Sequence, residues 1–147
     1  MSHRAGELTH ADGSLAALPV RARADRDQLG EGGMSVVCEV PVPGVLVAWL
    51  AGEMDASSAS PAEAELRRAL RRTRPRRLVL DLTDVTLLTS RGMTLLLRLR
   101  QLGRSNGFHV VLAGGSQRRV RRPLAITGLL PLFDVCPDVA HGVGPGR

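Results

Sequence analysis

The sequence of 147 residues contains no lysine and no tyrosine, and its 20 basic residues are all arginine. Because lysine is missing from the whole chain, its absence indicates GC-rich codon usage rather than a local function. Against 14 acidic residues, the arginines give a net charge of +6. Arginine binds planar anions such as carboxylate and phosphate. The basic balance is therefore compatible with acidic protein, nucleic acid or lipid partners and does not choose among them.

Aromatic residues and metal-ligand patterns are equally scarce. One Trp and two Phe argue against the aromatic platforms on which single-stranded nucleic acids stack. The two cysteines, Cys38 and Cys136, form neither a disulfide framework nor a metal-ligand spacing, and we expect both to be reduced. The four histidines show no ligand spacing either, so no metal or other cofactor is expected.

Long hydrophobic segments are also missing. No apolar run reaches the ~18 residues that a membrane span requires. Residues 1–13 lack the apolar core of a secretion signal. The sequence therefore predicts a cytoplasmic protein that does not contact a membrane.

The length fits one domain with terminal extensions. Residues 1–32 are rich in Ala, Gly, Arg and Asp and have no sustained periodicity, which predicts a disordered arm. Residues 33–136 contain the regular apolar patterns and are expected to form the folded domain. Residues 137–147 are rich in Gly and Pro, so we expect a flexible tail.

The first half of the domain predicts a β-hairpin and a helix. Residues 34–40 and 45–51 are β-type runs, and the Pro-Val-Pro-Gly sequence between them is a strong turn signal. Ser60 before Pro61 is a typical helix start, with a hydroxyl N-cap followed by proline at the first helical position. The pattern extends this helix to Arg72.

The central stretch predicts a buried strand, a loop and a second helix. An apolar run begins at Leu78 and ends at Asp84. The loop at 89–92 carries two hydroxyl residues, an arginine and a glycine. Leucines at helical spacing then predict a helix that reaches Leu102 and is ended by Gly103.

The rest of the domain continues the alternation of strands and helices. A strand at 108–113, a basic helix at 117–126 and a short final strand at 129–135 follow. The order β-β-α-β-α-β-α-β predicts an α/β fold, a mixed sheet with helices packed mainly on one face. Functional loops in such folds lie at the carboxyl ends of central parallel strands, and the loop at 89–92 occupies such an end. Within it, the Ser90 hydroxyl is expected to cap the following helix.

Three local patterns, in this order, resemble the STAS domain, the fold of bacterial anti-sigma factor antagonists. The step at 52–55, Gly-Glu-Met-Asp, is similar to Gly-Glu-Leu-Asp in the family. Residues 81–92 resemble the family's strand and its Asp-Ser-Ser/Thr-Gly loop. Residues 120–129, with the Leu-Phe pair at 132–133, resemble its third helix and the exit from it. The resemblance covers residues 34–135.

The resemblance implies a phosphorylation switch at Ser90, which stands where the family has the first serine of the loop. There, a partner anti-sigma factor with serine kinase activity phosphorylates the antagonist, and a phosphatase resets it. The dephosphorylated form binds the anti-sigma factor and frees a sigma factor. The loop departs from the family pattern at Thr89, where the family has Asp, and at Arg91, where it has Ser or Thr. The expected partner-binding residues are Asp55, Asp84, Thr89, Ser90, Arg91, Gly92 and Met93.

Two other functions remain open. Thr89 and Arg91 favour a STAS-type scaffold subunit of a transport or stress complex that is not phosphorylated. The arginine clusters at 67–77 and 118–122 permit a basic nucleic-acid binder, although no helix-turn-helix spacing supports it. No catalytic constellation or phosphate-binding glycine motif is present, so we expect no enzymatic activity. We expect a monomer or a weak homodimer.

Overall fold

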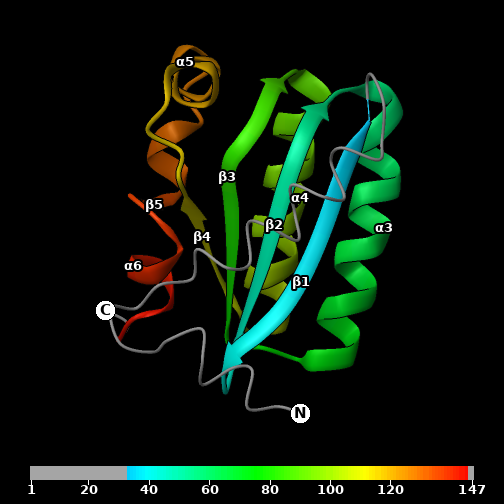
Figure 1. Cartoon of the computed structure of the whole chain (residues 1–147), viewed down its shortest axis with the longest axis vertical. Coiled ribbons are helices and arrows are strands. Elements are labelled where there is room, and N and C mark those ends of the chain that lie inside the picture. The colour runs from blue at the N-terminus through cyan, green and yellow to red at the C-terminus, as the bar shows by residue number, and fades with distance from the viewer. Residues whose placement is uncertain (1–32, 146–147) are drawn as a thin grey trace.

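The computed structural model describes residues 33–145. Its strands are β1 (Met34–Val42), β2 (Val45–Met54), β3 (Arg77–Leu88), β4 (His109–Ala113) and β5 (Asp134–Cys136). They form one sheet in the order β1-β2-β3-β4-β5 (Figure 1). β1 is antiparallel to β2, and the remaining neighbours are parallel. The mixed sheet and its opening hairpin confirm the predicted α/β fold. The arm expected at 1–32 lies outside the described residues.

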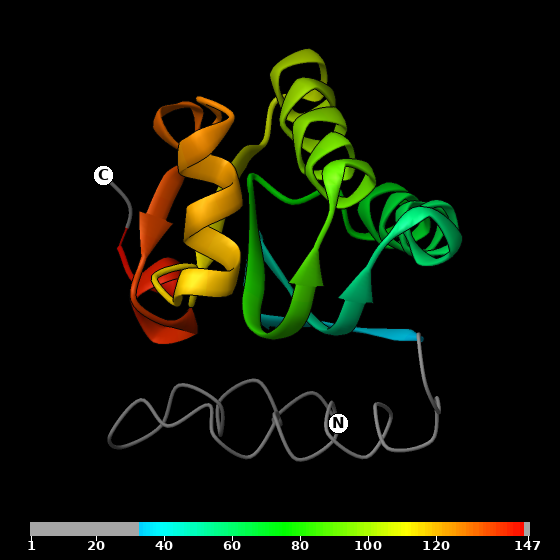
Figure 2. The ribbon, with the colours of Figure 1, turned by 90° about the horizontal axis from the view of Figure 1, so that it is seen from above.

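Each parallel connection passes through a helix. The helices are α3 (Ala56–Thr73), α4 (Ser90–Asn106), α5 (Arg118–Ile126) and α6 (Val139–Val143), with a 3₁₀ turn, η1 (Leu130–Leu132), before β5. α3, α4 and α5 cover one face of the sheet, as the sequence predicted, and the short α6 lies against the opposite face (Figure 2). In the described part of the chain, no helix has the length and apolar character needed to span a membrane.

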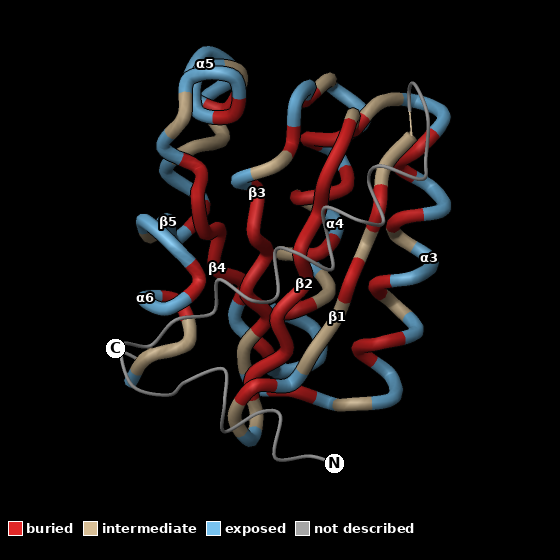
Figure 3. Tube along the Cα trace, in the orientation of Figure 1, coloured by how far each residue is buried: buried red, intermediate tan, exposed pale blue. Residues whose placement is uncertain are grey.

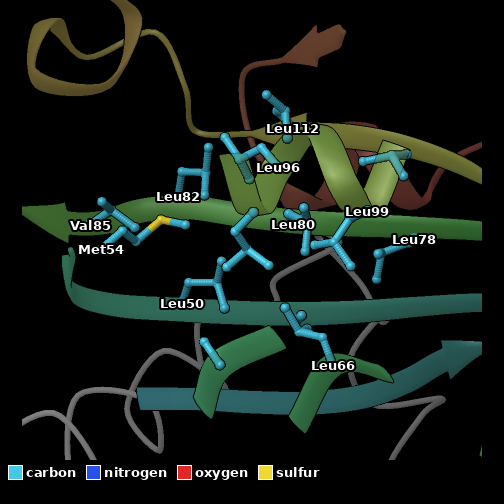
Figure 4. Close-up of a cluster of buried hydrophobic side chains, with 14 of the residues drawn as sticks. Leu50, Met54, Leu66, Leu78, Leu80, Leu82, Val85, Leu96, Leu99 and Leu112 are labelled. Atoms are coloured by element: carbon cyan, nitrogen blue, oxygen red, sulfur yellow. The ribbon is translucent and has the colours of Figure 1, made fainter. Parts of the chain in front are cut away.

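The sheet divides the core into two layers. The larger layer, beneath α3, α4 and α5, is rich in leucine and includes Leu50, Leu66, Leu80 and Leu96 (Figure 4). The smaller layer surrounds Trp49 on the α6 side. The central parts of β2 and β3 are buried on both faces (Figure 3). This explains why their sequences are continuous apolar runs rather than alternating patterns.

Helix α3 begins directly after Asp55, so the predicted start at Ser60 and Pro61 is wrong. The Asp55 Oδ1 atom accepts the N–H of Ser58 at 3.1 Å, and the Ser58 hydroxyl accepts the N–H of Asp55 at 3.0 Å. This reciprocal pair is a capping box. The helix therefore starts more than a turn before the Ser-Pro signal, and Pro61 lies inside it.

Other element ends also differ from the prediction. The final strand, expected at 129–135, is confined to β5 because the residues before it form η1. α4 ends at Asn106 and is capped by Gly107, in the left-handed conformation with φ of 85°, instead of ending before Gly103. Gly103 lies within the helix, and a side chain there would overlap Phe108, which packs in the position that a Cβ atom would occupy. β3 continues past Asp84, where the apolar run ends, because β2 pairs with it as far as Leu88.

The segment 137–147, expected to be a flexible tail, contains α6. Val139 of this helix packs in the smaller core layer. The Arg77 guanidinium donates hydrogen bonds to the carbonyl oxygens of Gly142 and Gly144, both at 2.8 Å. These contacts fix the helix on the sheet, which the Gly- and Pro-rich composition does not reveal. The domain boundaries themselves stay a prediction.

Candidate functional site

The predicted loop lies where β2 and β3 end side by side. Met54, the last residue of β2, pairs with Leu88, the last residue of β3, and each strand leads into a helix. The N–H and the hydroxyl of Thr89 both donate to the carbonyl oxygen of Met54, at 3.1 and 2.8 Å. The start of α4 is thereby fixed to the end of β2, and α3 and α4 begin at the same end of the molecule (Figure 1).

The N-terminus of α3 is closed by its own cap. The Asp55 Oδ1 atom accepts hydrogen bonds from the hydroxyl and N–H of Ser57, at 2.9 and 3.0 Å, and from those of Ser58, both at 3.1 Å. These bonds hold the pKa of Asp55 below its usual value, and the bond from the Ser57 hydroxyl has the largest effect. Asp55 therefore lies beside the loop with its carboxylate engaged in capping. Its contact with a partner stays a prediction.

The N-terminus of α4 has no such cap. Thr89 occupies the N-cap position, but its hydroxyl is turned to Met54 and makes no capping bond. Ser90 is the first residue of the helix, so the prediction that it caps the helix is wrong. Ser90 and Arg91 are exposed, and the first turn of α4 contains no acidic residue. The first turn of α4 therefore offers an anion backbone N–H groups and no carboxylate of its own.

Gly92 and Met93 form the buried side of the site. A Cβ atom on Gly92 would lie 2.7 Å from Met54 Cβ and 2.8 Å from Leu88 Cδ1. Only glycine allows the first turn of α4 to approach the two strand ends this closely. Met93 is 9% exposed, and its Sδ accepts a hydrogen bond from the Thr127 hydroxyl at 3.7 Å. Both residues shape the site from beneath, and their contact with a partner stays a prediction.

Asp84 is the expected site residue that the fold places away from the loop. It lies within β3, opposite Ala51 of β2. At ~3.3 Å per residue, it is about 16 Å from Thr89 along the strand. Asp81, earlier in the same strand, is buried and accepts a hydrogen bond from the Thr83 hydroxyl at 2.8 Å. Burial raises the pKa of Asp81 to about 6.

The described residues offer no metal centre. Within residues 33–145, no group of three or more His, Cys, Asp or Glu side chains is placed to hold a metal ion. Neither cysteine forms a disulfide. Burial, reinforced by the charge of Glu65, raises the pKa of Cys38 to about 11. This thiol therefore stays protonated near neutral pH and is a poor nucleophile.

Two side chains that shape this end of the molecule were not found from the sequence. β3 extends beyond the end of β4, so part of one edge of β3 has no strand beside it. Gln117 Nε2 donates to the carbonyl oxygens of Leu82 and Thr83, at 2.8 and 3.0 Å. Arg119 Nε donates to that of Val85 at 2.7 Å. These bonds hold α5 beside the end of β3. No local pattern indicates them, because donor and acceptor lie 34 or 35 positions apart.

The family model of the STAS domain matches residues 40–142, which include the loop and the helices around it. The chain belongs to the STAS domain family. In this STAS domain, Ser90 follows the carboxyl end of a central parallel strand, as the order of strands and helices predicts. No match was found among curated protein sequences.

Solved structures with the same fold include antagonists of anti-sigma factors. The STAS domain is similar to an anti-sigma factor antagonist from Mycobacterium paratuberculosis, with 30% identity, 75% of this chain and 91% of that chain covered, and a TM-score of 0.62. The phosphorylated form of SpoIIAA, a cell fate determinant of Bacillus, is 20% identical over 73% of this chain and 96% of that chain, with a TM-score of 0.54. The murine anion transporter Slc26a9 is 14% identical over 89% of this chain and 25% of that chain, with a TM-score of 0.61. At such low sequence identity, the similarity to SpoIIAA and to Slc26a9 shows a common fold and nothing further.

Proposed function

We propose that this STAS domain is an anti-sigma factor antagonist, which binds an anti-sigma factor and thereby frees a sigma factor. The observation that carries the proposal is the exposed Ser90 at the uncapped start of α4. It is supported by the 30% identity to an anti-sigma factor antagonist of Mycobacterium paratuberculosis. The partner has serine kinase activity, and both proteins act in the bacterial cytoplasm.

Phosphorylation of Ser90 is the proposed switch. A phosphate adds roughly 1.5 to 2 negative charges. The N–H groups and the dipole at the start of α4 favour such an anion, and the adjacent Arg91 can pair with it. The modified domain therefore stays folded while its binding surface changes charge, so that the partner is released. A phosphatase then restores the binding form.

Thr89 changes the physical setting of this switch. A threonine hydroxyl donates to the Met54 carbonyl oxygen, whereas an ionised aspartate at this position has no hydrogen to donate. The aspartate would instead cap α4 and repel a phosphate on Ser90. Thr89 thus leaves the helix end open to the phosphate, and the kinase that modifies this loop does not depend on an acidic neighbour.

The test compares the full-length wild type, Ser90→Ala and Ser90→Glu against each anti-sigma factor of the source organism. We expect wild type and Ser90→Ala to bind one of them in titration calorimetry, and Ser90→Glu to bind it at least about ten-fold more weakly. Circular dichroism should show the same fold for all three proteins. After incubation with the partner and ATP, mass spectrometry should find phosphate on Ser90.

The possible outcomes separate the switch from the function. Equal binding by all three proteins, or phosphate only at other residues, contradicts the switch. The absence of binding to every anti-sigma factor contradicts the function.

A scaffold subunit without phosphorylation is the second candidate, and Arg91 favours it. Arg91 places a bulky cation beside the acceptor hydroxyl, where the family pattern has a small hydroxyl residue. Ser90 that is never phosphorylated in cells, together with partner binding unaffected by Ser90→Glu, would support this candidate.

A further inference from the structure

A groove beside the proposed switch combines apolar and basic side chains. It lies between the end of β3 and α5 and has a volume of about 600 Å³. Its apolar lining comes from Leu87, Leu88, Pro123 and Ile126, and its basic lining includes Arg118 and Arg122.

Two aliphatic side chains of this groove are unusually exposed. Ile126 is 70% exposed and Leu87 is 44% exposed. They belong to different elements and are brought together by the packing of α5 against β3. Single exposed aliphatic residues are normal on a protein surface, but their gathering in one hollow is typical of an interaction site.

The charged residues that line the groove are all basic. α5 contains four arginines and no acidic residue. Arg119 is engaged with the carbonyl oxygen of Val85 and holds the helix in place. Arg118 and Arg122 are exposed, and the residues that line the groove include no carboxylate. An occupant that neutralises this charge must be acidic.

The groove continues into the proposed switch. Leu88 lies directly before Thr89, which begins the switch loop. At the other side, Thr127 follows Ile126 and donates a hydrogen bond to Met93 of α4. A segment that occupies the groove therefore reaches the start of α4.

We propose that this groove binds an acidic amphipathic segment of a partner protein. Apolar side chains of the segment lie against Leu87 and Ile126, and its carboxylates pair with Arg118 and Arg122. A nucleic acid would use the arginines but leave the aliphatic side chains without a role. The inference rests on the proposed function only for the identity of the partner. If the partner is an anti-sigma factor, the surface of that protein that faces α5 is acidic.

The groove is first tested without any anti-sigma factor. The probe is a fluorescein-labelled helical peptide with leucines at i, i+4 and i+7 and glutamates on the flanking positions, and its counterpart carries lysine in place of glutamate. The full chain should bind the glutamate peptide and not the lysine peptide. Arg122→Glu should weaken this binding about ten-fold. Arg121→Glu is the matched control: it makes the same change at an exposed position of α5 outside the groove lining and should leave the affinity nearly unchanged.

A second pair of variants tests the apolar part. Ile126→Ser should weaken peptide binding, whereas Leu132→Ser, at an exposed position of η1 outside the groove, should not. Thermal melts check that each variant is folded. Random-sequence duplex DNA and phosphatidylglycerol vesicles are the competing probes. The proposal is overturned by peptide binding insensitive to Arg122→Glu and Ile126→Ser, by equal binding of the lysine peptide, by no peptide binding, or by binding only to DNA or vesicles.

The same variants separate this proposal from the proposed function. If an anti-sigma factor binds and is insensitive to Arg122→Glu, the groove proposal fails and the function stands. If no anti-sigma factor binds while the acidic peptide does, the function fails and the groove stands.

Discussion

The hydroxyl of Thr89 donates a 2.8 Å hydrogen bond to the carbonyl oxygen of Met54, and the Thr89 N–H donates to the same atom. This pair joins the start of α4 to the end of β2 and so fixes the position of Ser90 on the sheet. It also turns away the side chain that would otherwise cap α4. One hydroxyl therefore positions the proposed switch and leaves the helix end open to an anion.

Thr89→Val keeps the size of the side chain and removes its donor. The Met54 carbonyl retains one hydrogen bond, from the N–H of residue 89, so we expect a loss of about 1 kcal/mol in the free energy of unfolding. Thr89→Ser keeps the hydroxyl and should therefore lose less stability than Thr89→Val. Urea denaturation measures both variants. Equal stability of Thr89→Val and wild type would show that the hydroxyl contact contributes nothing.

Gly92→Ala should destabilise the protein, although alanine is the better helix former. The added methyl group would lie within 2.8 Å of Met54 and Leu88 atoms, and relieving this overlap costs about 1–3 kcal/mol. Thr94→Ala, at an exposed position of the same helix, has no such contact and should be neutral or slightly stabilising. A rise in melting temperature for Gly92→Ala would contradict the close packing of α4 on the strand ends.

Asp81 should make stability fall as the pH rises. Burial raises the pKa of Asp81 from 3.8 to about 6. Between about pH 4 and pH 6 the folded protein therefore binds more protons at this site than the unfolded chain, and the free energy of unfolding decreases with pH. The shift corresponds to at most about 3 kcal/mol, lost in full above about pH 6.

Asp81→Asn removes this titration while leaving an oxygen for the Thr83 hydroxyl. We expect the variant to be at least as stable as wild type at neutral pH, and the difference between the two proteins to shrink or reverse towards about pH 4. Urea denaturation across this range measures it. A difference that stays constant with pH would show that Asp81 does not titrate in this window.

Ser90→Glu should leave the fold intact and add a small stabilisation. A negative charge at the start of α4 interacts favourably with the helix dipole, by about 0.3–1 kcal/mol at low salt. Ser105→Glu, at an exposed position in the last turn of the same helix, should destabilise by a similar amount. Thermal unfolding at low and high salt measures both, and added salt should reduce both effects. A large loss of stability for Ser90→Glu would mean that phosphorylation unfolds the domain instead of changing its surface.

Local sequence patterns were sufficient for the core elements and insufficient for their ends. The apolar runs at 45–51 and 78–82 predict buried strands, because strands buried on both faces need apolar residues at successive positions. The helix start was misplaced because Asp55 and Ser58 form a capping box ahead of the stronger-looking Ser60-Pro61 signal. The resemblance located Ser90, but the direction of the Thr89 hydroxyl depends on β2, which is distant in sequence.

The alternation of strands and helices, the family and the serine after the central strand could all be predicted from the amino-acid sequence. The alternation follows from the periodicity of residues along the chain, and the other two follow from local patterns that resemble those of the STAS family. The open N-terminus of α4, the packing of α6 on the sheet and the groove that Leu87 shares with Ile126 became visible in the folded molecule alone. Each of these depends on contacts between residues far apart in the chain, and no local pattern encodes such contacts.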